Sequence, residues 1–246
     1  MPRIHLYSAE TPSEDSHWLL PAGPSHHLLR VLRARPGQEL TLFTGDGRDY
    51  PAELVGTQGK QALLAVRQAR QRDTASPLHC CLWLPLIRAE RWDWALQKAT
   101  ELGVHAIQPV VCRHSLVPLR EAQAARRQER WREILIAACE QSSATRIPQL
   151  LPARALSELE APAAQLAVVC DPGYSKRLGS ILAARPGCAS IVLLCGPEGG
   201  LHPAELERAE SLGFVGAQLG PRILRAETAA ITALTLAQGF CGDLGG

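Results

Sequence analysis

The sequence is poor in aromatic residues, lysine and net charge, and it has no long apolar segment. Phe, Trp and Tyr make up 4% of its 246 residues, which argues against binding single-stranded nucleic acid by extensive base stacking. Lys and Arg number 26 against 24 Asp and Glu, so the formal charge of +2 excludes a strongly basic nucleic-acid coat protein. No apolar run reaches the roughly 18 residues of a membrane helix, and the first residues, MPRIHLYSAE, lack a signal-peptide pattern. We therefore expect a cytoplasmic protein without a membrane segment.

The small positive excess lies entirely in the first third of the chain. Residues 1–72 hold nine basic and seven acidic side chains, whereas residues 73–246 hold 17 of each. Of the 26 basic residues only three are lysines, and the guanidinium fork of arginine suits phosphates and base edges better than an ammonium group. Codon bias would give the same preference for arginine, so this count alone does not identify a nucleic-acid partner.

The eight cysteines have no CxxC spacing, and three of them end apolar runs. Cys112, Cys170 and Cys195 follow such runs, where cysteine behaves as a small hydrophobic residue. Cys112 and His114 form the only metal-like pair, and a zinc site needs about four ligands. We expect reduced thiols, as in a cytoplasmic protein, and no metal site.

Two composition patterns divide the chain. Residues 1–72 resemble a small β domain or barrel with one helix, which opens near Ser25 and stops at Pro36-Gly37. The stretch 71–77 is polar and without periodicity, which is typical of a linker.

Residues 73–246 alternate apolar strand-like runs with helical segments. Strands are predicted at 78–86, 105–111, 165–170, 189–195 and 214–219, and helices at 89–103, 121–143, 175–184, 203–212 and 226–240. Such alternation predicts an α/β domain with a mostly parallel sheet that is covered on both faces.

The strongest motif is IVLLCGPEGG, residues 191–200, in which a buried type of strand leads directly into glycines. Ligands of open α/β sheets bind at the carboxyl ends of strands, and glycine lets the main chain approach a ligand closely. The spacing fits neither a dinucleotide fingerprint nor a P-loop. A glycine-rich turn without a ligand is the alternative interpretation.

A second loop, LGPRILRAET at 219–228, also follows a strand-like run and leads into an apolar helix. Its charged residues lie next to an apolar helix. Charged groups beside a buried helix need ion-pair or hydrogen-bond partners. Two such loops at successive strand ends predict a shared cleft. Alternatively, Arg225 and Glu227 simply neutralise each other or cap the helix.

GPEGG followed by LGPRILRAETA resembles the signature of the small-subunit ribosomal RNA uridine-N3 methyltransferases, within the knotted SPOUT superfamily. Three further stretches agree with that family in the same order: HLLRVLRARPGQ near the start, LQKATELGV at 96–104, and AACEQSSATRIPQ at 137–149. GPEGG alone would be weak support, but five motifs in register over nearly the whole chain are specific.

The resemblance implies a PUA-like RNA-binding domain over 1–72 and a SPOUT methyltransferase domain with a deep C-terminal trefoil knot over 73–246. It also implies a homodimer formed through the knot region, although burial of the small-residue helix from Ala226 in its own core would leave the same pattern. The two loops are expected to hold the cofactor S-adenosylmethionine. By carry-over the cofactor-binding candidates are Leu194, Gly196, Gly199, Gly200, Leu219, Ile223, Leu224 and Ala226.

The implied reaction is methyl transfer to N3 of one uridine in 16S rRNA of the small ribosomal subunit. An arginine near the uracil carbonyls would stabilise the negative charge that develops there, and a carboxylate would accept the proton. Catalytic candidates are Arg225, which we favour as the electrostatic stabiliser, Glu198 and Arg222. Glu227 lies in the same segment, and the sequence assigns no general base.

Basic residues outside the loops are candidates for RNA contacts. They are Arg3, Arg30, Arg33, Arg35, Lys98, Arg113 and Arg146. We expect Arg30 and Arg33 on one face of the N-terminal helix, because they are three residues apart. We expect Lys98, Arg113 and Arg146 to line the substrate side of the C-terminal domain. A solvated helix face would explain the Arg30 group equally well.

Two positions depart from the family pattern. Ser143-Ala144 stands where Gly-Arg is expected, which removes one arginine and puts an RNA contact there in doubt. His202 stands where a better helix cap such as Ser is usual.

Two other functions compete with the methyltransferase. A non-catalytic RNA-binding ribosome assembly factor would keep the N-terminal domain, but the intact glycine loops argue against it. An α/β nucleotide-binding enzyme that acts on a small molecule would leave the N-terminal domain unexplained.

Overall fold

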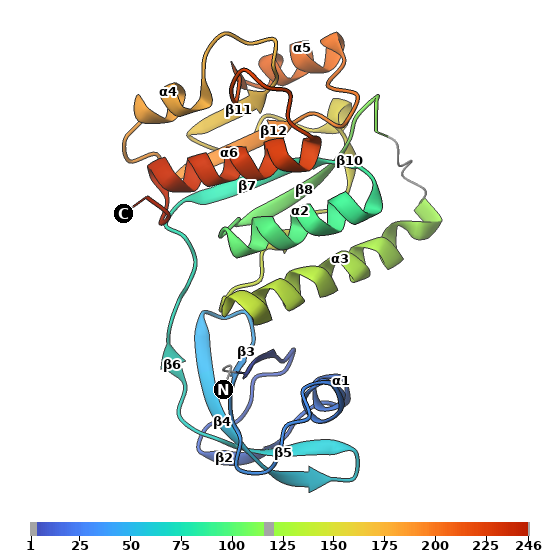
Figure 1. The fold of residues 1–246 in the computed structure, drawn as a ribbon, viewed down its shortest axis with the longest axis vertical. Helices are drawn as coiled ribbons and strands as arrows, with labels where there is room; N and C mark the ends of the chain where they lie inside the picture. The colour runs from blue at the N-terminus through green and yellow to red at the C-terminus, as the bar shows by residue number, and fades with distance from the viewer. Residues whose placement is uncertain (1–3, 116–120, 246) are drawn as a thin grey trace. The chain divides into compact units, whose positions relative to one another are not determined.

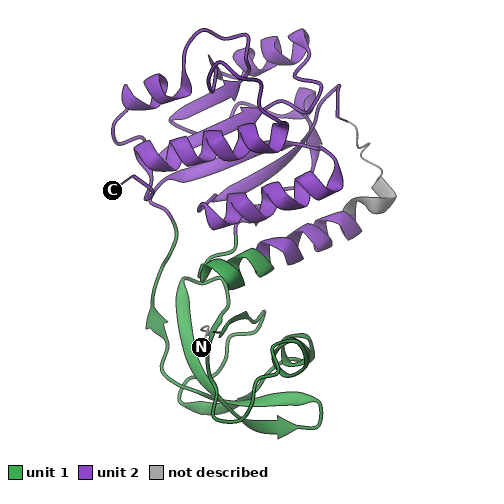
Figure 2. Cartoon of the chain, in the orientation of Figure 1, with its two compact units in different colours: residues 1–75, 136–147 green, residues 76–135, 148–246 purple. Residues whose placement is uncertain are grey.

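The computed structural model describes residues 4–115 and 121–245, in two compact units (Figures 1 and 2). The first unit comprises 1–75 with 136–147, and the second comprises 76–135 with 148–246. Helix α3 (Glu121–Ser142) contributes residues to both units. The chain therefore does not divide by a single cut near residue 72, because the end of α3 and the turn after it pack with the N-terminal strands.

The N-terminal unit is built on a sheet with the strand order β1-β3-β4-β5-β2, and β6 pairs with β4. The strands are β1 (Ile4–Tyr7), β2 (Ser16–Leu19), β3 (Glu39–Phe43), β4 (Arg48–Gln58), β5 (Gln61–Val66) and β6 (Arg70–Gln71). β1 and β3 run parallel and the other pairs run antiparallel. Alternate burial along β5 sends Ala62, Leu64 and Val66 into the core.

The N-terminal helix is shorter than the sequence predicted. α1 (Ala22–His26) continues as a π-helical turn, η1 (His27–Val31), in which the Leu32 N–H donates to the His27 carbonyl at 2.9 Å. Arg33 then adopts a left-handed conformation with φ 53°. The prediction that Arg30 and Arg33 share one helix face is therefore wrong, because Arg33 lies beyond the helix end.

The predicted linker at 71–77 is only partly a linker. Gln71 belongs to β6, and the next three residues bond to the turn that follows α3. The pairs are Arg72 with Ser143, Asp73 with Arg146, and Thr74 with Thr145. We call this set the 72–74 clamp. It holds the start of the predicted linker within the first unit.

The second unit contains a parallel sheet with the strand order β10-β8-β7-β12-β11-β13, and β9 pairs with β8. The strands are β7 (His79–Pro85), β8 (Ala106–Val111), β9 (Gln149–Leu150), β10 (Arg154–Ala155), β11 (Leu166–Cys170), β12 (Ser190–Cys195) and β13 (Val215–Ala217). Each strand pair in this sheet is parallel, as predicted. The short β9, β10 and the 3-10 turn η2 (Leu156–Glu158) carry no periodicity and were not predicted.

Helices cover both faces of this sheet, as the apolar runs predicted. They are α2 (Ala89–Glu101), α4 (Leu178–Ala183), α5 (Pro203–Ser211) and α6 (Ala226–Cys241), and the first part of α3 packs on α2 through Trp131 and Trp92. Val192 and Leu194 of β12 pack with Ala209 of α5 in one core cluster. Their neighbours in β12 point to the other face, where α6 contacts β7 and β12. Among the described residues no helix is long and apolar enough to cross a membrane.

The cysteine side chains are free thiols, and the three that end strands are buried. Burial raises the pKa of Cys81 to about 11 and that of Cys112 and Cys139 to about 12. These thiols stay protonated, and Cys112 packs as a small hydrophobic group, as predicted. No cluster of His, Cys, Asp or Glu within the described ranges could hold a metal ion.

A stability prediction follows from the residue after α3. Ser143 adopts φ 58°, a conformation in which a Cβ is unfavourable by roughly 1 kcal/mol or more and glycine is not. Ser143→Gly should therefore raise the free energy of unfolding by about 1 kcal/mol, measured by urea denaturation. Ser143→Ala keeps the Cβ and is the control, because its free energy of unfolding should not rise. A Gly variant that is no more stable than the Ala variant would contradict this explanation.

Candidate active site

Four neighbouring strands end at the same edge of the parallel sheet. β7, β12, β11 and β13 are adjacent in that order, so the segments after their carboxyl ends gather there. Those segments are the start of α2, the 196–200 loop, residues 171–172 and the 218–225 loop. The two motif loops of the sequence thus lie at one edge because strand order brings them together.

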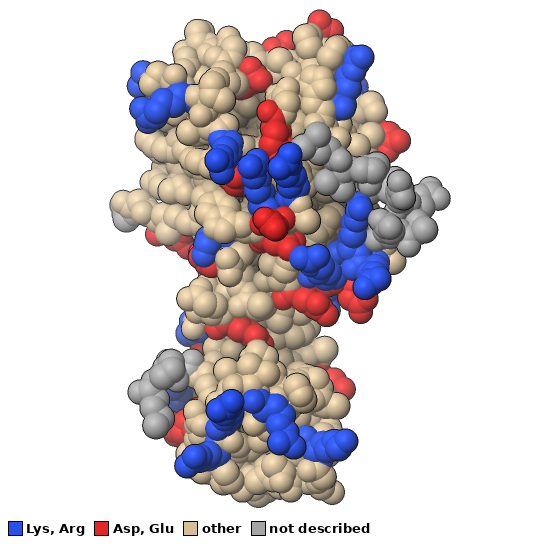
Figure 3. All heavy atoms as spheres, turned by 45° about the vertical axis from the view of Figure 1, so that its right-hand side comes forward, with Lys and Arg blue, Asp and Glu red and all other residues tan. Residues whose placement is uncertain are grey.

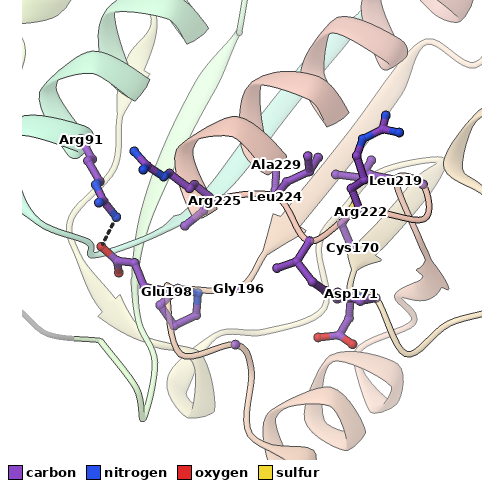
Figure 4. Close-up of a pocket in the computed structure, with 16 residues that line it drawn as sticks. Arg91, Cys170, Asp171, Gly196, Glu198, Leu219, Arg222, Leu224, Arg225 and Ala229 are labelled. Carbon is purple, nitrogen blue, oxygen red and sulfur yellow. Dashed lines mark ion pairs between the residues drawn. The ribbon is translucent and has the colours of Figure 1, made fainter.

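A cavity of about 330 Å³ lies among these segments (Figure 4), within the size range of small-molecule sites. It is lined by Arg91, Cys170, Asp171, Pro172, Gly196, Pro197, Glu198, Gly200, Leu219, Gly220, Arg222, Ile223, Leu224, Arg225, Ala226 and Ala229. Charged groups, apolar side chains and glycine main chain all face it. Such a lining suits a ligand that has both apolar and polar parts.

The glycines of the 196–200 loop serve different purposes. A Cβ on Gly196 would lie 3.1 Å from the Leu201 backbone nitrogen, so the tight turn favours glycine at this position. Gly200 has φ 72° and open space around it, next to the cavity. A Cβ on Gly199 would lie 2.9 Å from the Cβ of His114, so Gly199 is needed for packing against the segment after β8.

The loop is anchored by the start of α5. His202 caps this helix. Its side-chain Nδ1 accepts from the Ala204 backbone N–H at 3.3 Å, and its backbone N–H donates to the Glu205 carboxylate at 2.8 Å. The expectation that His202 is a poor cap is wrong, because the imidazole nitrogen takes the place of a serine oxygen. Glu205 also accepts from the Arg113 N–H at 2.7 Å, and this contact ties the segment after β8 to α5.

An arginine that sequence reasoning missed connects two acidic residues of the motif loops. Arg91 of α2 places Nη1 3.5 Å from Glu198 Oε1 and Nε 3.7 Å from Glu227 Oε1. Glu227 is 8% exposed, and its Oε2 has no hydrogen-bond partner among the described residues. Arg91, rather than Arg225, is thus the counter-charge of Glu227, which answers the alternative in which Arg225 and Glu227 neutralise each other.

The structure brings together most of the predicted site residues. Gly196, Glu198, Gly200, Leu219, Arg222, Ile223, Leu224, Arg225 and Ala226 line the cavity. In the view of Figure 4, Arg225 lies on the same side of the cavity as Arg91 and Glu198, and Arg222 and Asp171 lie on the other side. Leu194 is fully buried in β12, and neither it nor Gly199 is among the lining residues.

Cys195, which ends β12 at this edge of the sheet, is poorly suited to act as a nucleophile. A hydrogen bond with Cys170, together with burial, raises the pKa of the Cys195 thiol well above its ordinary value. A thiol that stays protonated is a poor nucleophile.

The predicted RNA-binding residues fall into different settings. Arg30, Arg33 and Arg35 are exposed, and Arg3 lies outside the described residues. Lys98 is paired with Glu101 at 2.7 Å, and the Arg113 side chain contacts His202 Nε2 at 3.0 Å. Arg146 does not belong with the C-terminal domain as predicted: it packs in the first unit, where Asp73 binds its guanidinium through two nitrogens.

Comparisons with known proteins identify the family of this chain. Residues 74–238 match a family described as an RNA methyltransferase domain, and residues 24–66 match an RNA methyltransferase PUA domain. A Bacillus subtilis protein named ribosomal RNA small subunit methyltransferase E is 30% identical over 85% of both chains. The chain belongs to the ribosomal RNA small subunit methyltransferase E family.

Solved structures of this kind have the same fold. The ribosomal RNA small subunit methyltransferase E of Neisseria gonorrhoeae, bound to S-adenosyl methionine, has a TM-score of 0.88 at 35% identity, over 98% of this chain and 99% of that one. A Legionella pneumophila methyltransferase with bound cofactor SAM has a TM-score of 0.92 at 31% identity, over 99% of this chain and 100% of that one. The resemblance seen in the sequence and the SPOUT-type α/β fold with an N-terminal PUA-like domain are confirmed.

Among the cavity-lining residues that sequence reasoning missed are Arg91, Cys170 and Asp171. Cys170 and Asp171 end the run LAVVCD, and Arg91 follows the strand LHCCLWLPL after a short loop. Cys170 and Asp171 lie at the carboxyl end of a predicted strand, and Arg91 lies in the first turn of the helix that follows another, so that signal was present in the sequence. What the sequence lacked was the order of the strands, which decides whose ends are neighbours.

The Arg91 network yields a stability prediction. Arg91→Met leaves the buried Glu227 carboxylate without its counter-charge, and should lower the free energy of unfolding by about 2 kcal/mol in urea denaturation. In the double variant Arg91→Met/Glu227→Gln most of this decrease should disappear, because no buried charge remains. Equal decreases in the single and double variants would show that Arg91 acts through packing alone.

Proposed function

We propose that this chain uses S-adenosylmethionine to methylate N3 of one specific uridine in 16S rRNA of the small ribosomal subunit. The observation that carries the proposal is the single cavity that both motif loops line. The names of its relatives, and the S-adenosyl methionine bound in the Neisseria gonorrhoeae structure, support this assignment. Because the proposed target is the ribosome, we also propose that this chain acts in the cytoplasm.

The cavity fits the cofactor. Gly196, Gly200 and Gly220 expose main-chain groups that can bond to an adenine edge or to the amino-acid part, and Leu219, Ile223 and Leu224 offer apolar contact for the ring. Ile223 is 80% exposed, so its side chain is available to cover a ligand. When bound, S-adenosylmethionine would supply an electrophilic methyl group. Leu194 and Gly199 would support the loops from behind.

The reaction requires a negative charge on the uracil. The N3 proton has a pKa about two units above neutrality, so the anion costs about 3 kcal/mol at pH 7. Arg225 lines the cavity beside Arg91 and Glu198, where its guanidinium can stabilise the charge that develops on a uracil carbonyl. We assign this role to Arg225, with Arg222 on the other side of the cavity as a second cation and Glu198 as the adjacent carboxylate.

The proposal includes the knot and the dimer of the superfamily. The loops at 196–200 and 219–226 would be the knot loops around the cofactor. α6 buries Ala230, Ala233 and Ala237 and leaves Phe240 49% exposed, so one face of this helix is packed in its own unit while an apolar side chain is still available to a second copy. Sedimentation of the full chain would test the dimer.

Two measurements test the function itself. Calorimetry with S-adenosylmethionine should show saturable binding, and mapping of methylated uridines should show one site in 16S rRNA that depends on this chain. Absence of cofactor binding would favour the non-catalytic assembly factor. Methylation of free nucleosides would favour the small-molecule enzyme.

Arg225→Ala should lower the rate of methyl transfer to small ribosomal subunits at least about 100-fold, because it removes the cation placed for the uracil charge. Cofactor affinity should stay within a few fold, measured by calorimetry. Arg154→Ala, which removes an exposed arginine of the same unit that does not line the cavity, should have neither effect. Unchanged turnover of the Arg225 variant would remove Arg225 from the mechanism.

A further inference from the structure

The N-terminal unit exposes two large apolar residues that are consecutive in the sequence, Val31 and Leu32. Val31 is 60% exposed and Leu32 is 41% exposed, although Leu28, in the same turn, is fully buried in the core. In the described part of this unit, Val55 is the other large apolar residue with more than a third of its surface exposed, at 38%. Core packing therefore does not explain why apolar residues stand at positions 31 and 32.

The backbone at this position is also unusual. The π-helical turn η1 ends at Val31, and Arg33 adopts φ 53°, which is uncommon for a residue other than glycine. The Ala34 N–H donates to the Leu28 carbonyl at 3.0 Å and closes the end of the helix. Single π-turns and left-handed residues of this kind are found disproportionately at functional sites.

Three arginines surround the apolar pair in the sequence. Arg30, Arg33 and Arg35 are exposed, and none of them forms an ion pair with an acidic residue in the described ranges. Figure 3 turns the side of the unit that carries α1 towards the viewer, and Lys and Arg side chains gather there with uncharged surface between them. Unpaired guanidinium groups around apolar side chains fit a ligand that has both phosphates and apolar faces.

We propose that residues 30–35, which we call the VL tip, bind an RNA segment with unpaired bases. Arg30, Arg33 and Arg35 contact phosphates, and Val31 and Leu32 pack against base faces. Because stacking within a duplex hides the faces of its bases, only an unpaired segment offers apolar surface to these side chains. The inference rests on the proposed function, whose chemistry agrees with it: N3 of a uridine carries the imino proton used in base pairing, so it reacts only when the base is unpaired.

Binding of a short single-stranded RNA, and of the same strand paired to its complement, separates the two kinds of interaction. Affinities are measured by fluorescence anisotropy over a range of KCl concentrations. Val31→Ser/Leu32→Ser should weaken binding of the single strand about tenfold, with the salt dependence unchanged and little effect on the duplex. Arg30→Gln/Arg33→Gln/Arg35→Gln should lower the slope of log affinity against log salt by about 0.7 for each phosphate that the variant no longer neutralises.

Val55→Ser is the matched control, since it removes an exposed aliphatic side chain elsewhere in the same unit and should bind both RNAs as the wild type does. Thermal melting and S-adenosylmethionine binding check that the variants are folded. Equal weakening for single strand and duplex, or none, would overturn the VL tip, as would a change of oligomeric state in place of RNA affinity. Any of these results, obtained with a wild-type chain that methylates small ribosomal subunits, would overturn the VL tip alone. A wild-type chain that does not methylate them would overturn the proposed function.

Discussion

The parallel pairing of β7, β12, β11 and β13 is the constraint on which the candidate active site depends. In a parallel sheet every carboxyl end lies at the same edge, so four segments that are far apart in the sequence converge without any contact specific to the ligand. The register of β12 with β7 and β11 fixes where Cys195 ends the strand, and with it where Gly196 turns the chain. The cavity is thus a consequence of strand order, and the loop residues determine only what it can bind.

Within this frame the loops are held by contacts that cross between elements. Gly199 packs against His114 after β8, Glu205 of α5 accepts from Arg113, and Arg91 of α2 joins Glu198 to Glu227. These contacts position the main chain of the 196–200 loop and the start of α6 before any ligand arrives. Such preorganisation lowers the cost of ordering the site at the moment of binding, and charge stabilisation in methyl transfer benefits from it.

The N-terminal unit is held together differently from the second unit. Its sheet is mostly antiparallel, and the 72–74 clamp attaches the chain that leaves it to the turn after α3. Arg146 is used in this clamp, so a residue that resembled an RNA contact has a structural partner in Asp73. The exposed arginines of the VL tip have no such partner among the described residues, and this difference in pairing separates the two groups of basic residues.

The sequence by itself determined the class of the longer elements of the second unit, the two glycine loops and the family. Apolar runs and helical periodicity depend on neighbours along the chain, so the five longer parallel strands and the helices from α2 onward could be predicted within a few residues, whereas the two-residue strands β9 and β10 could not. Tertiary structure alone decided that Arg91, Cys170 and Asp171 join the cavity, that Gly199 packs against His114, and that Arg33 leaves the helix in a left-handed conformation. The physical reason is that periodicity records which face of an element is buried, whereas a site forms from side chains that meet only after strand order and register bring distant segments together.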